Sequence, residues 1–195
     1  MAETLELDAR TTALILIDLQ RGIVSRPTAP HASADVVKRG VALAGAFRAR
    51  GAFVVLVRVA FAADDGDRLK PRIDAAMPPG PWPSDFSDLL PEVGPRDGDF
   101  VITKHQWGAF YGTELDLQLR RRGIRAIVIG GISTNFGVES TARDAWERSY
   151  QLVFVEDAMA GPTAEAHAFA TGTIFPRLGL VRSTAQVLAA MGART

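Results

Sequence analysis

The chain of 195 residues is long enough for one domain with a substantial core, and two independent cores would be cramped in it. Its 22 basic and 22 acidic side chains give a net charge of zero, which argues against binding to nucleic acid or to an anionic membrane by bulk charge. Hydrophobic residues make up 47% and charged residues 23%, as in globular proteins, and the absence of cysteine excludes disulfides and a thiol nucleophile.

The amino-terminal residues indicate no targeting segment. Met1–Arg10 carries three acids and no apolar stretch, unlike a secretory signal. The apolar run Ala13–Ile17 is far too short to cross a bilayer. We therefore expect a cytoplasmic protein that binds neither membrane nor nucleic acid.

Short apolar segments alternate with helical patterns along most of the chain. Ala13–Leu19 is apolar without alternation, which is typical of a strand buried on both faces. Ala34–Arg50 has apolar residues at helical spacing and stops at Gly51. Further strands are expected at Ala52–Ala60, Phe100–Thr103, Ala126–Gly130, Leu152–Val155 and Leu180–Arg182. Further helices are expected at Thr113–Arg122, Asn135–Arg148, Thr163–Phe175 and Thr184–Met191. This alternation predicts an α/β fold with a mostly parallel sheet and helices on both faces.

A proline-rich segment between Ala62 and Gly98 interrupts this alternation. It holds seven of the eleven prolines and shows no convincing strand or long helix. A structureless segment of this length is usually a functional lid or flap. Because Trp82 and Phe86 supply apolar anchors, we expect residues 62–98 to form a long lid or interface loop that packs onto the body or onto a neighbouring subunit.

Polar residues at strand ends are the candidates for a site, because ligands bind at the carboxyl ends of the strands in open α/β sheets. The first strand ends in Asp18, with Gln20 just beyond it. A carboxylate at the end of a buried strand loses water, which raises its pKa unless a cation lies close. The alternative is that Asp18 only caps the helix or turn that follows.

The third strand ends in Lys104, and the next nine positions hold three aromatic residues and two glycines. Aromatic side chains form pocket walls, and an ammonium group beside them needs a counter-charge, for which Asp18 is the obvious candidate. The alternative is a surface lysine whose stem lies along core aromatics.

The fourth strand leads into a glycine-rich turn, which we call the 131–137 turn (Gly131–Gly137). Its polar residues can cap the helix that follows, whose free N–H groups make a site for an anion or a carbonyl oxygen. Gly137 falls in the first helical turn, where glycine costs up to about 1 kcal/mol relative to alanine. This cost indicates that a side chain there would collide with something, and helix–strand packing space is the alternative explanation.

These segments resemble the isochorismatase-like hydrolase superfamily. The resemblance rests on Asp18 after its strand, on Lys104–Thr113, on Gly131–Ala145 and on Tyr150–Ala158, and it covers nearly the whole chain in order. It implies a single domain over residues 1–195, folded as a three-layer α/β/α sandwich with a doubly wound sheet of about six strands. It also implies an active site built from an Asp, a Lys and usually a Cys.

Asp18 and Lys104 match the first two of these catalytic residues. The peptide between Ile132 and Ser133 matches one that is typically cis in the family and shapes an oxyanion-binding turn. The nucleophilic cysteine aligns with Gly137, so the resemblance places this chain in the branch with glycine at that position and closes the covalent thioester route.

The resemblance implies no cofactor. Nicotinamidase-like members carry an Asp-x-His metal cluster after the second strand, whereas Arg58–Arg68 contains no histidine. His31, His105 and His167 also lack partners at metal-ligand spacing, and we expect no metal site. His31 is expected at the surface and His167 in helix packing, while His105 is expected either to lie at the surface or to contact the substrate.

A glycine at this position also occurs in the true isochorismatases of the family, which cleave a vinyl ether without a covalent intermediate. By resemblance, Asp18 would be the general acid, Lys104 would orient it, and Gly137 would complete the catalytic set. The side chains expected to bind substrate are Gln20, Trp107, Phe110, Ile132, Ser133, Asn135 and Phe136.

Two alternatives stay open beside a hydrolase that acts on a small carboxylate or vinyl ether. One is an amide or imide hydrolase in which Asp18 activates water directly. The other is a non-catalytic member that uses the pocket for ligand binding or the sheet for assembly. By resemblance the chain forms a homodimer or homotetramer, with a small molecule as its substrate.

Overall fold

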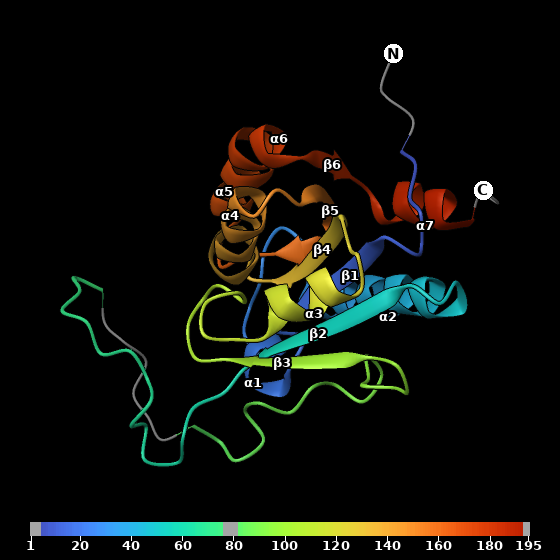
Figure 1. Ribbon diagram of the computed structural model, residues 1–195. Helices are drawn as coiled ribbons and strands as arrows, with labels where there is room; N and C mark the ends of the chain where they lie inside the picture. Colours follow the sequence, from blue (N-terminus) through green and yellow to red (C-terminus); the bar gives the residue numbers. More distant parts are fainter. Residues whose placement is uncertain (1–4, 76–81, 193–195) are drawn as a thin grey trace.

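The computed structural model describes residues 5–75 and 82–192 and shows a sheet between two layers of helices (Figure 1). In these residues six strands form the sheet: β1 (Thr12–Ile17), β2 (Phe53–Val59), β3 (Phe100–Lys104), β4 (Ala126–Ile132), β5 (Gln151–Ala160) and β6 (Leu180–Arg182). The helices are α1 (Arg21–Val24), α2 (Ser33–Ala49), α3 (Leu115–Arg121), α4 (Glu139–Glu147), α5 (Ala164–Phe169), α6 (Phe175–Leu178) and α7 (Thr184–Gly192). Two π-helical turns, η1 (Thr134–Val138) and η2 (Ala170–Ile174), precede α4 and α6. Within the described ranges, no helix has the length and apolar character needed to cross a membrane.

The strand order is β3-β2-β1-β4-β5-β6, and all neighbouring strands are parallel. The chain builds outward from β1 to β3, returns to the other side of β1, and builds outward again from β4 to β6. Strand order therefore reverses between β1 and β4, and ligands bind at such a switch point in open α/β sheets. Asp18 follows β1 and the 131–137 turn follows β4, so both lie at this point.

Helices cover both faces of the sheet, and side chains of β1 alternate between the two cores. Ala13, Ile15 and Ile17 share a core with α3, α4 and α6, whereas Leu14 and Leu16 share one with α2 and α7. All five side chains are at most 1% exposed. Because β1 is buried on both faces, its sequence is continuously apolar. The predicted three-layer α/β/α fold with a parallel, doubly wound sheet is confirmed.

The observed elements differ from the expected ones mainly at their ends. β5 continues to Ala160 instead of stopping at Val155, and its pairing with β4 shifts register between Ile129 and Gly131. The half-buried acids Glu156 and Asp157 hide this extension in the sequence, because an irregular pairing lets the strand continue past a break in its apolar pattern. No sequence pattern predicts the four-residue helix α1.

The proline-rich segment contains no helix or strand in its described residues, 62–75 and 82–98. In Figure 1 it extends outward from the carboxyl edge of the sheet and returns beside α1. Its second half is tied to the body, because Gly22 N donates to Phe86 O at 3.0 Å and Leu90 N donates to Leu19 O at 3.1 Å. The Trp82 ring packs on Phe86 with centroids 4.5 Å apart. The expected apolar anchors thus hold the returning half of the segment.

Candidate active site

Asp18 follows β1 at the switch point and is only 5% exposed. Its backbone N–H donates to Val57 O at 2.9 Å, which keeps the residue in line with β2. Its φ of 53° then turns the chain out of the sheet. A positive φ is uncommon outside glycine, although aspartate adopts it more readily than most residues. The carboxyl group is therefore held inside the protein at the end of the strand.

Lys104, the last residue of β3, forms a buried ion pair with Asp18. Its Nζ donates to Asp18 Oδ2 at 2.7 Å and to Gln106 O at 3.1 Å. Lys104 is 2% exposed, which excludes the alternative of a surface lysine. The expected pairing of the two charges is thus observed, although β2 separates β1 and β3 in the sheet.

The second carboxyl oxygen of Asp18, Oδ1, is buried and has no hydrogen-bond partner among the described residues. Burial raises the pKa of Asp18 to about 6, and Lys104 offsets only part of this rise. Desolvation disfavours the charged carboxylate, and one ion pair does not replace all of the lost water contacts. The carboxyl group can therefore hold or release a proton near neutral pH.

The 131–137 turn passes very close to the end of β1. A Cβ at Gly131 would lie 2.2 Å from Ile17 O, and the φ of Gly131 is 122°, so both space and backbone conformation require glycine there. The peptide bond between Ile132 and Ser133 is cis, as the resemblance implies. Ser133 O then accepts a hydrogen bond from Val138 N at 3.1 Å and closes η1.

Gly137 faces the Asp18 carboxyl group. A Cβ built at Gly137 would lie 3.0 Å from Ile17 Cγ2 and 3.3 Å from Asp18 Oδ2. A side chain at this position would thus touch the carboxyl group. Glycine leaves that side of Asp18 open.

Thr141 on α4 connects the 131–137 turn to the loop after β3, and it was not among the expected site residues. Its hydroxyl donates to Gly137 O at 2.7 Å and accepts from Ala109 N at 3.1 Å. The only sequence signal is a threonine four residues after Gly137, since hydroxyl groups in helices often bond back to the carbonyl at that spacing. Thr141 is a positioning residue for the turn.

The aromatic residues expected to line the site lie in two different places. Trp107 and Phe136 pack together with ring centroids 4.9 Å apart, and they are 62% and 37% exposed. The backbone oxygen of Trp107 lies 3.6 Å from the Cβ position of Gly137, so the loop that carries Trp107 passes beside Gly137. Phe110 is 4% exposed and lies 6.1 Å from the ring of Tyr150, in the core. These contacts do not support a place for Phe110 in a substrate-binding wall.

Gln20 is held by hydrogen bonds to the backbone, whereas the buried Asn135 Oδ1 has no hydrogen-bond partner in the described residues. Gln20 Nε2 donates to Val59 O and Phe86 O, both at 2.9 Å, and its Oε1 accepts from Val59 N at 2.8 Å. Gln20 therefore clamps the proline-rich segment to β2, and its contacts do not support substrate binding. The Oδ1 of Asn135 lies beside Gly161 at the end of β5 and is buried without a partner in the described chain.

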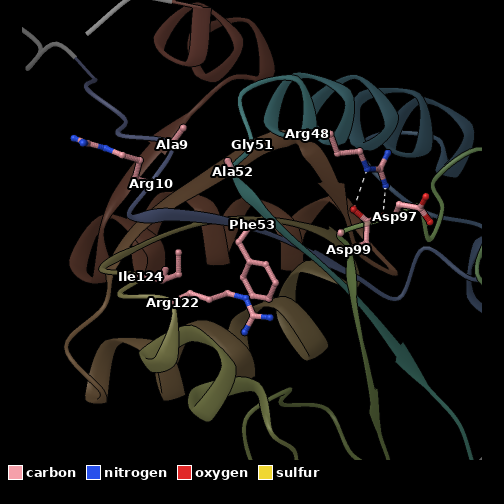
Figure 2. A pocket seen from close by; sticks show the side chains of 11 residues that line it. Ala9, Arg10, Arg48, Gly51, Ala52, Phe53, Asp97, Asp99, Arg122 and Ile124 are labelled. Atoms are coloured by element: carbon pink, nitrogen blue, oxygen red, sulfur yellow. Dashed lines mark hydrogen bonds and ion pairs between the residues drawn. The ribbon is translucent and has the colours of Figure 1, made fainter.

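A separate hollow of about 320 Å³ lies at the opposite, amino-terminal edge of the sheet (Figure 2). Arg10, Phe53 and Asp97 are among the residues that line it. Arg48 donates two hydrogen bonds to Asp99 across one side of the hollow, as Figure 2 shows. This ion pair is satisfied, and no expected site residue lines the hollow, so the hollow lies apart from the candidate site at the carboxyl edge.

Known proteins are similar to this chain in sequence and in fold. The Isochorismatase domain model matches residues 12–186. The chain belongs to the isochorismatase family. The uncharacterized isochorismatase family protein YecD of Escherichia coli O157:H7 is 50% identical over 187 residues, which cover 96% of this chain and all of YecD. The structure of an isochorismatase family protein from Burkholderia thailandensis has a TM-score of 0.92 at 46% identity and covers 96% of this chain and 98% of that one.

A more distant relative of this isochorismatase-family chain has a named activity. Ureidoacrylate amidohydrolase RutB of Methylorubrum extorquens is 32% identical over 190 residues, which cover 83% of this chain and 75% of RutB. The family match and this relative identify the chain as a hydrolase. The expected family, fold class and enzyme class are therefore confirmed.

Proposed function

We propose that this hydrolase uses Asp18 for acid–base catalysis and forms no covalent enzyme intermediate. The observation that carries the proposal is a buried carboxyl group whose pKa is raised to about 6, with one oxygen paired to Lys104 and the other unpartnered in the described residues. Groups that titrate near the working pH are the most effective general acids and bases. Gly137 stands where the family nucleophile aligns, which leaves acid–base chemistry to Asp18.

The first candidate reaction is hydrolysis of a vinyl ether that carries a carboxylate. The proton of Asp18 moves to the terminal vinyl carbon, the C=C electron pair forms the new C–H bond, and the ether carbon becomes an oxocarbenium ion. A water oxygen bonds to that carbon and returns a proton to Asp18. The hydroxyl proton of the resulting hemiketal then passes to the ether oxygen, and the C–O bond to that oxygen breaks, which gives a ketone and an alcohol.

The other residues of the site serve this reaction by position. Lys104 holds Asp18 Oδ2, so that the proton to be transferred resides on Oδ1. The 131–137 turn, with Ile132 and Ser133, offers backbone N–H groups for a substrate carboxylate or a water. Trp107 and Phe136 form the apolar wall beside Gly137.

The second candidate reaction is amide hydrolysis without a thiol, and the similarity to RutB favours it. Asp18 would act as a base that takes a proton from water while the water oxygen bonds to the carbonyl carbon. The 131–137 turn would stabilise the oxyanion, and the departing nitrogen would receive the proton from Asp18 as the C–N bond breaks.

A pH profile on two substrates separates these reactions. Isochorismate and ureidoacrylate are offered to the purified protein, and kcat/KM is measured from pH 4.5 to about pH 8, across the pKa of about 6. An acid role predicts that activity falls as pH rises through 6, because Asp18 loses its proton. A base role predicts that activity falls as pH drops through 6. Asp18→Asn should abolish either activity, and unchanged turnover in this variant would overturn the proposal.

The alignment of Gly137 with the family nucleophile has a separate test, because the natural sequence holds no cysteine and an introduced one is the only thiol. Gly137→Cys places one cysteine beside Asp18, and mass spectrometry after an ureidoacrylate quench should find an acyl adduct on it. Gly45→Cys is the matched control, since Gly45 lies on α2 with nothing within 4 Å of its Cβ position. Equal labelling of both variants, or of neither, would contradict the alignment of Gly137 with the nucleophile.

We also propose that the enzyme is a cytoplasmic homodimer or homotetramer in which the proline-rich segment contacts a neighbouring subunit. Tyr111 and Trp107 beside the site are 77% and 62% exposed, as are Leu69 (62%) and Ile73 (53%) in the segment. Contiguous exposed apolar patches mark protein interfaces, and the proposal places these four side chains in one such interface. Light scattering should report an oligomer, and a monomer at working concentration would remove this part of the proposal. Cell fractionation tests the location.

A further inference from the structure

A second group of titratable side chains lies behind the 131–137 turn, away from Asp18. His31 comes from the loop before α2, Glu156 from β5 and His167 from α5, and one ligand atom of each lies within 4.8 Å of the others. Ala29 and Gly161 exchange backbone hydrogen bonds of 2.9 and 2.8 Å, which hold the His31 loop against the end of β5. Only the fold brings these three side chains together.

The distances within this group are too long for good hydrogen bonds and suit a shared metal ion. Glu156 Oε1 forms a long hydrogen bond of 3.4 Å with His167 Nε2 and lies 3.6 Å from His31 Nε2. A charge-assisted N–H···O bond is about 2.7–2.9 Å long. Zinc–ligand bonds of about 2.0–2.1 Å in a tetrahedron place neighbouring ligand atoms about 3.3–3.4 Å apart. The two measured distances lie close to this tetrahedral edge.

His31 supplies an independent observation. Its Nε2 is buried and has no hydrogen-bond partner in the described residues, although the side chain is 25% exposed. A buried imidazole nitrogen without a partner costs free energy unless it binds something. Its position near Glu156 Oε1 directs it toward the point that the three ligand atoms share.

The outer contacts of the group hold its ligands in place. His167 Nδ1 is hydrogen-bonded to Thr134 Oγ1 at 2.9 Å, and Thr134 is fully buried. Metal-binding histidines almost always fix their other ring nitrogen in this manner, which orients the ring. The Thr28 hydroxyl donates to His31 O at 2.8 Å and so fixes the backbone that carries the second imidazole.

We propose that His31, Glu156 and His167 bind one divalent transition-metal ion, with Zn²⁺ as the best match. Two imidazole nitrogens and a carboxylate suit zinc, whereas calcium and magnesium take all-oxygen sites. Three protein ligands leave a fourth position, and the Glu156 side chain, 39% exposed, opens this position to solvent. Thr134 is the first residue of η1 and is hydrogen-bonded to His167, so the bound ion stabilises the 131–137 turn through His167. This proposal replaces the expectation of no metal site.

Equilibrium dialysis of chelator-treated protein against Zn²⁺ tests the proposal without any substrate. Wild type should bind one ion per chain, and His31→Ala and Glu156→Gln should each lose this binding. Thr134→Val, which removes only the outer contact of His167, should weaken binding about 10- to 100-fold. His105→Ala is the matched control, because His105 faces the single carboxylate of Asp67 at 3.3 Å and should bind zinc as wild type does.

Thermal unfolding provides the second readout. Zn²⁺ should raise the melting temperature of wild type and His105→Ala, because a ligand that binds only the folded state stabilises it, and should not raise that of Glu156→Gln. If His167→Ala does not fold, the two more exposed ligands, His31 and Glu156, still decide the outcome. The absence of stoichiometric binding, or binding that His31→Ala and Glu156→Gln leave unchanged, would overturn the proposal.

Discussion

Two ion pairs with the same 2.7 Å contact, one partly buried and one buried, stand at opposite edges of the sheet and are built differently. At the amino edge, Asp99 accepts from Arg48 Nε and Nη2 and from Arg96 N, and Arg48 also donates to Val93 O. At the carboxyl edge, Asp18 accepts a hydrogen bond from Lys104, and its Oδ1 has no partner among the described residues. Both carboxyl oxygens of Asp99 therefore accept hydrogen bonds, whereas Asp18 Oδ1 accepts none from the described residues.

This difference fits a structural role for the Arg48–Asp99 pair and the acid–base role that we propose for Asp18. A buried carboxylate with several donors is stabilised in its charged form, whereas one with a single donor carries most of its desolvation cost. The pKa of Asp18 is raised because of this desolvation cost. Burial and pair distance alone do not distinguish the two sites, but the number of hydrogen bonds to each carboxyl group does.

The largest expected effect is on catalysis. Asp18→Asn should lower kcat/KM about 10²- to 10⁴-fold, because general acid–base catalysis contributes that much. Asp99→Asn should leave kcat/KM near the wild-type value, since Asp99 lies at the other edge of the sheet. Initial rates on isochorismate or ureidoacrylate, whichever the wild type hydrolyses, measure both variants. Equal losses of kcat/KM in Asp18→Asn and Asp99→Asn would contradict different roles for the two ion pairs.

The next largest effect is on the free energy of unfolding and concerns the Arg48–Asp99 pair. Asp99→Asn should lower the free energy of unfolding by about 3 kcal/mol, because removing one charge leaves Arg48 buried without its counter-ion. The exposed Asp97→Asn, two residues away, should change it by less than about 0.5 kcal/mol. Urea denaturation followed by circular dichroism compares them. A stability loss as small for Asp99 as for Asp97 would contradict the structural role.

A smaller effect tests the contact that supports the carboxyl edge. A Cβ at Gly22 would lie 2.0 Å from Phe86 Cδ2, so Gly22→Ala should displace Phe86 and lower the free energy of unfolding by about 1–3 kcal/mol. Gly45→Ala, on an open face of α2, should raise it by about 0.5–1 kcal/mol. Limited proteolysis should cut the proline-rich segment faster in Gly22→Ala alone. A stabilised Gly22→Ala would show that Phe86 does not pack there.

The last effect, the pH dependence of stability, changes the free energy of unfolding by at most about 1.4 kcal/mol per pH unit. Between about pH 6 and pH 4 the native state holds a proton on Asp18 that the unfolded chain, with a pKa of 3.8, releases. The native state therefore gains stability from Asp18 as pH falls through 6, and the gain levels off below 3.8. The difference between wild type and Asp18→Asn should grow in favour of wild type by up to about 3 kcal/mol. Urea denaturation at a series of pH values should show this trend, and a flat difference would refute it.

The sequence predicts the parts of the site that depend on strand ends. Asp18 and Lys104 follow buried parallel strands, so topology alone brings them to one edge, and the 131–137 turn joins them there. Side-chain direction within a loop is not encoded so simply. Phe110 and Trp107 lie three residues apart, yet one packs in the core and the other is exposed.

Contacts between distant segments are beyond what the sequence patterns show. Gln20 looks like a substrate ligand beside Asp18, but its amide is used by Val59 and Phe86. His31 and His167 are brought together by the bridge between Ala29 and Gly161, which no spacing pattern reveals. These residues acquire their roles only when the sheet is complete.

A carbon-13 NMR titration of the aspartate carboxyl groups tests the central claim most directly. The Asp18 signal is assigned by its absence from Asp18→Asn. We predict that it titrates with a midpoint near pH 6, because burial outweighs the pull of Lys104. A midpoint at or below the ordinary value of 3.8 would show that Asp18 is a saturated, structural carboxylate like Asp99 and would contradict its role as the acid–base group.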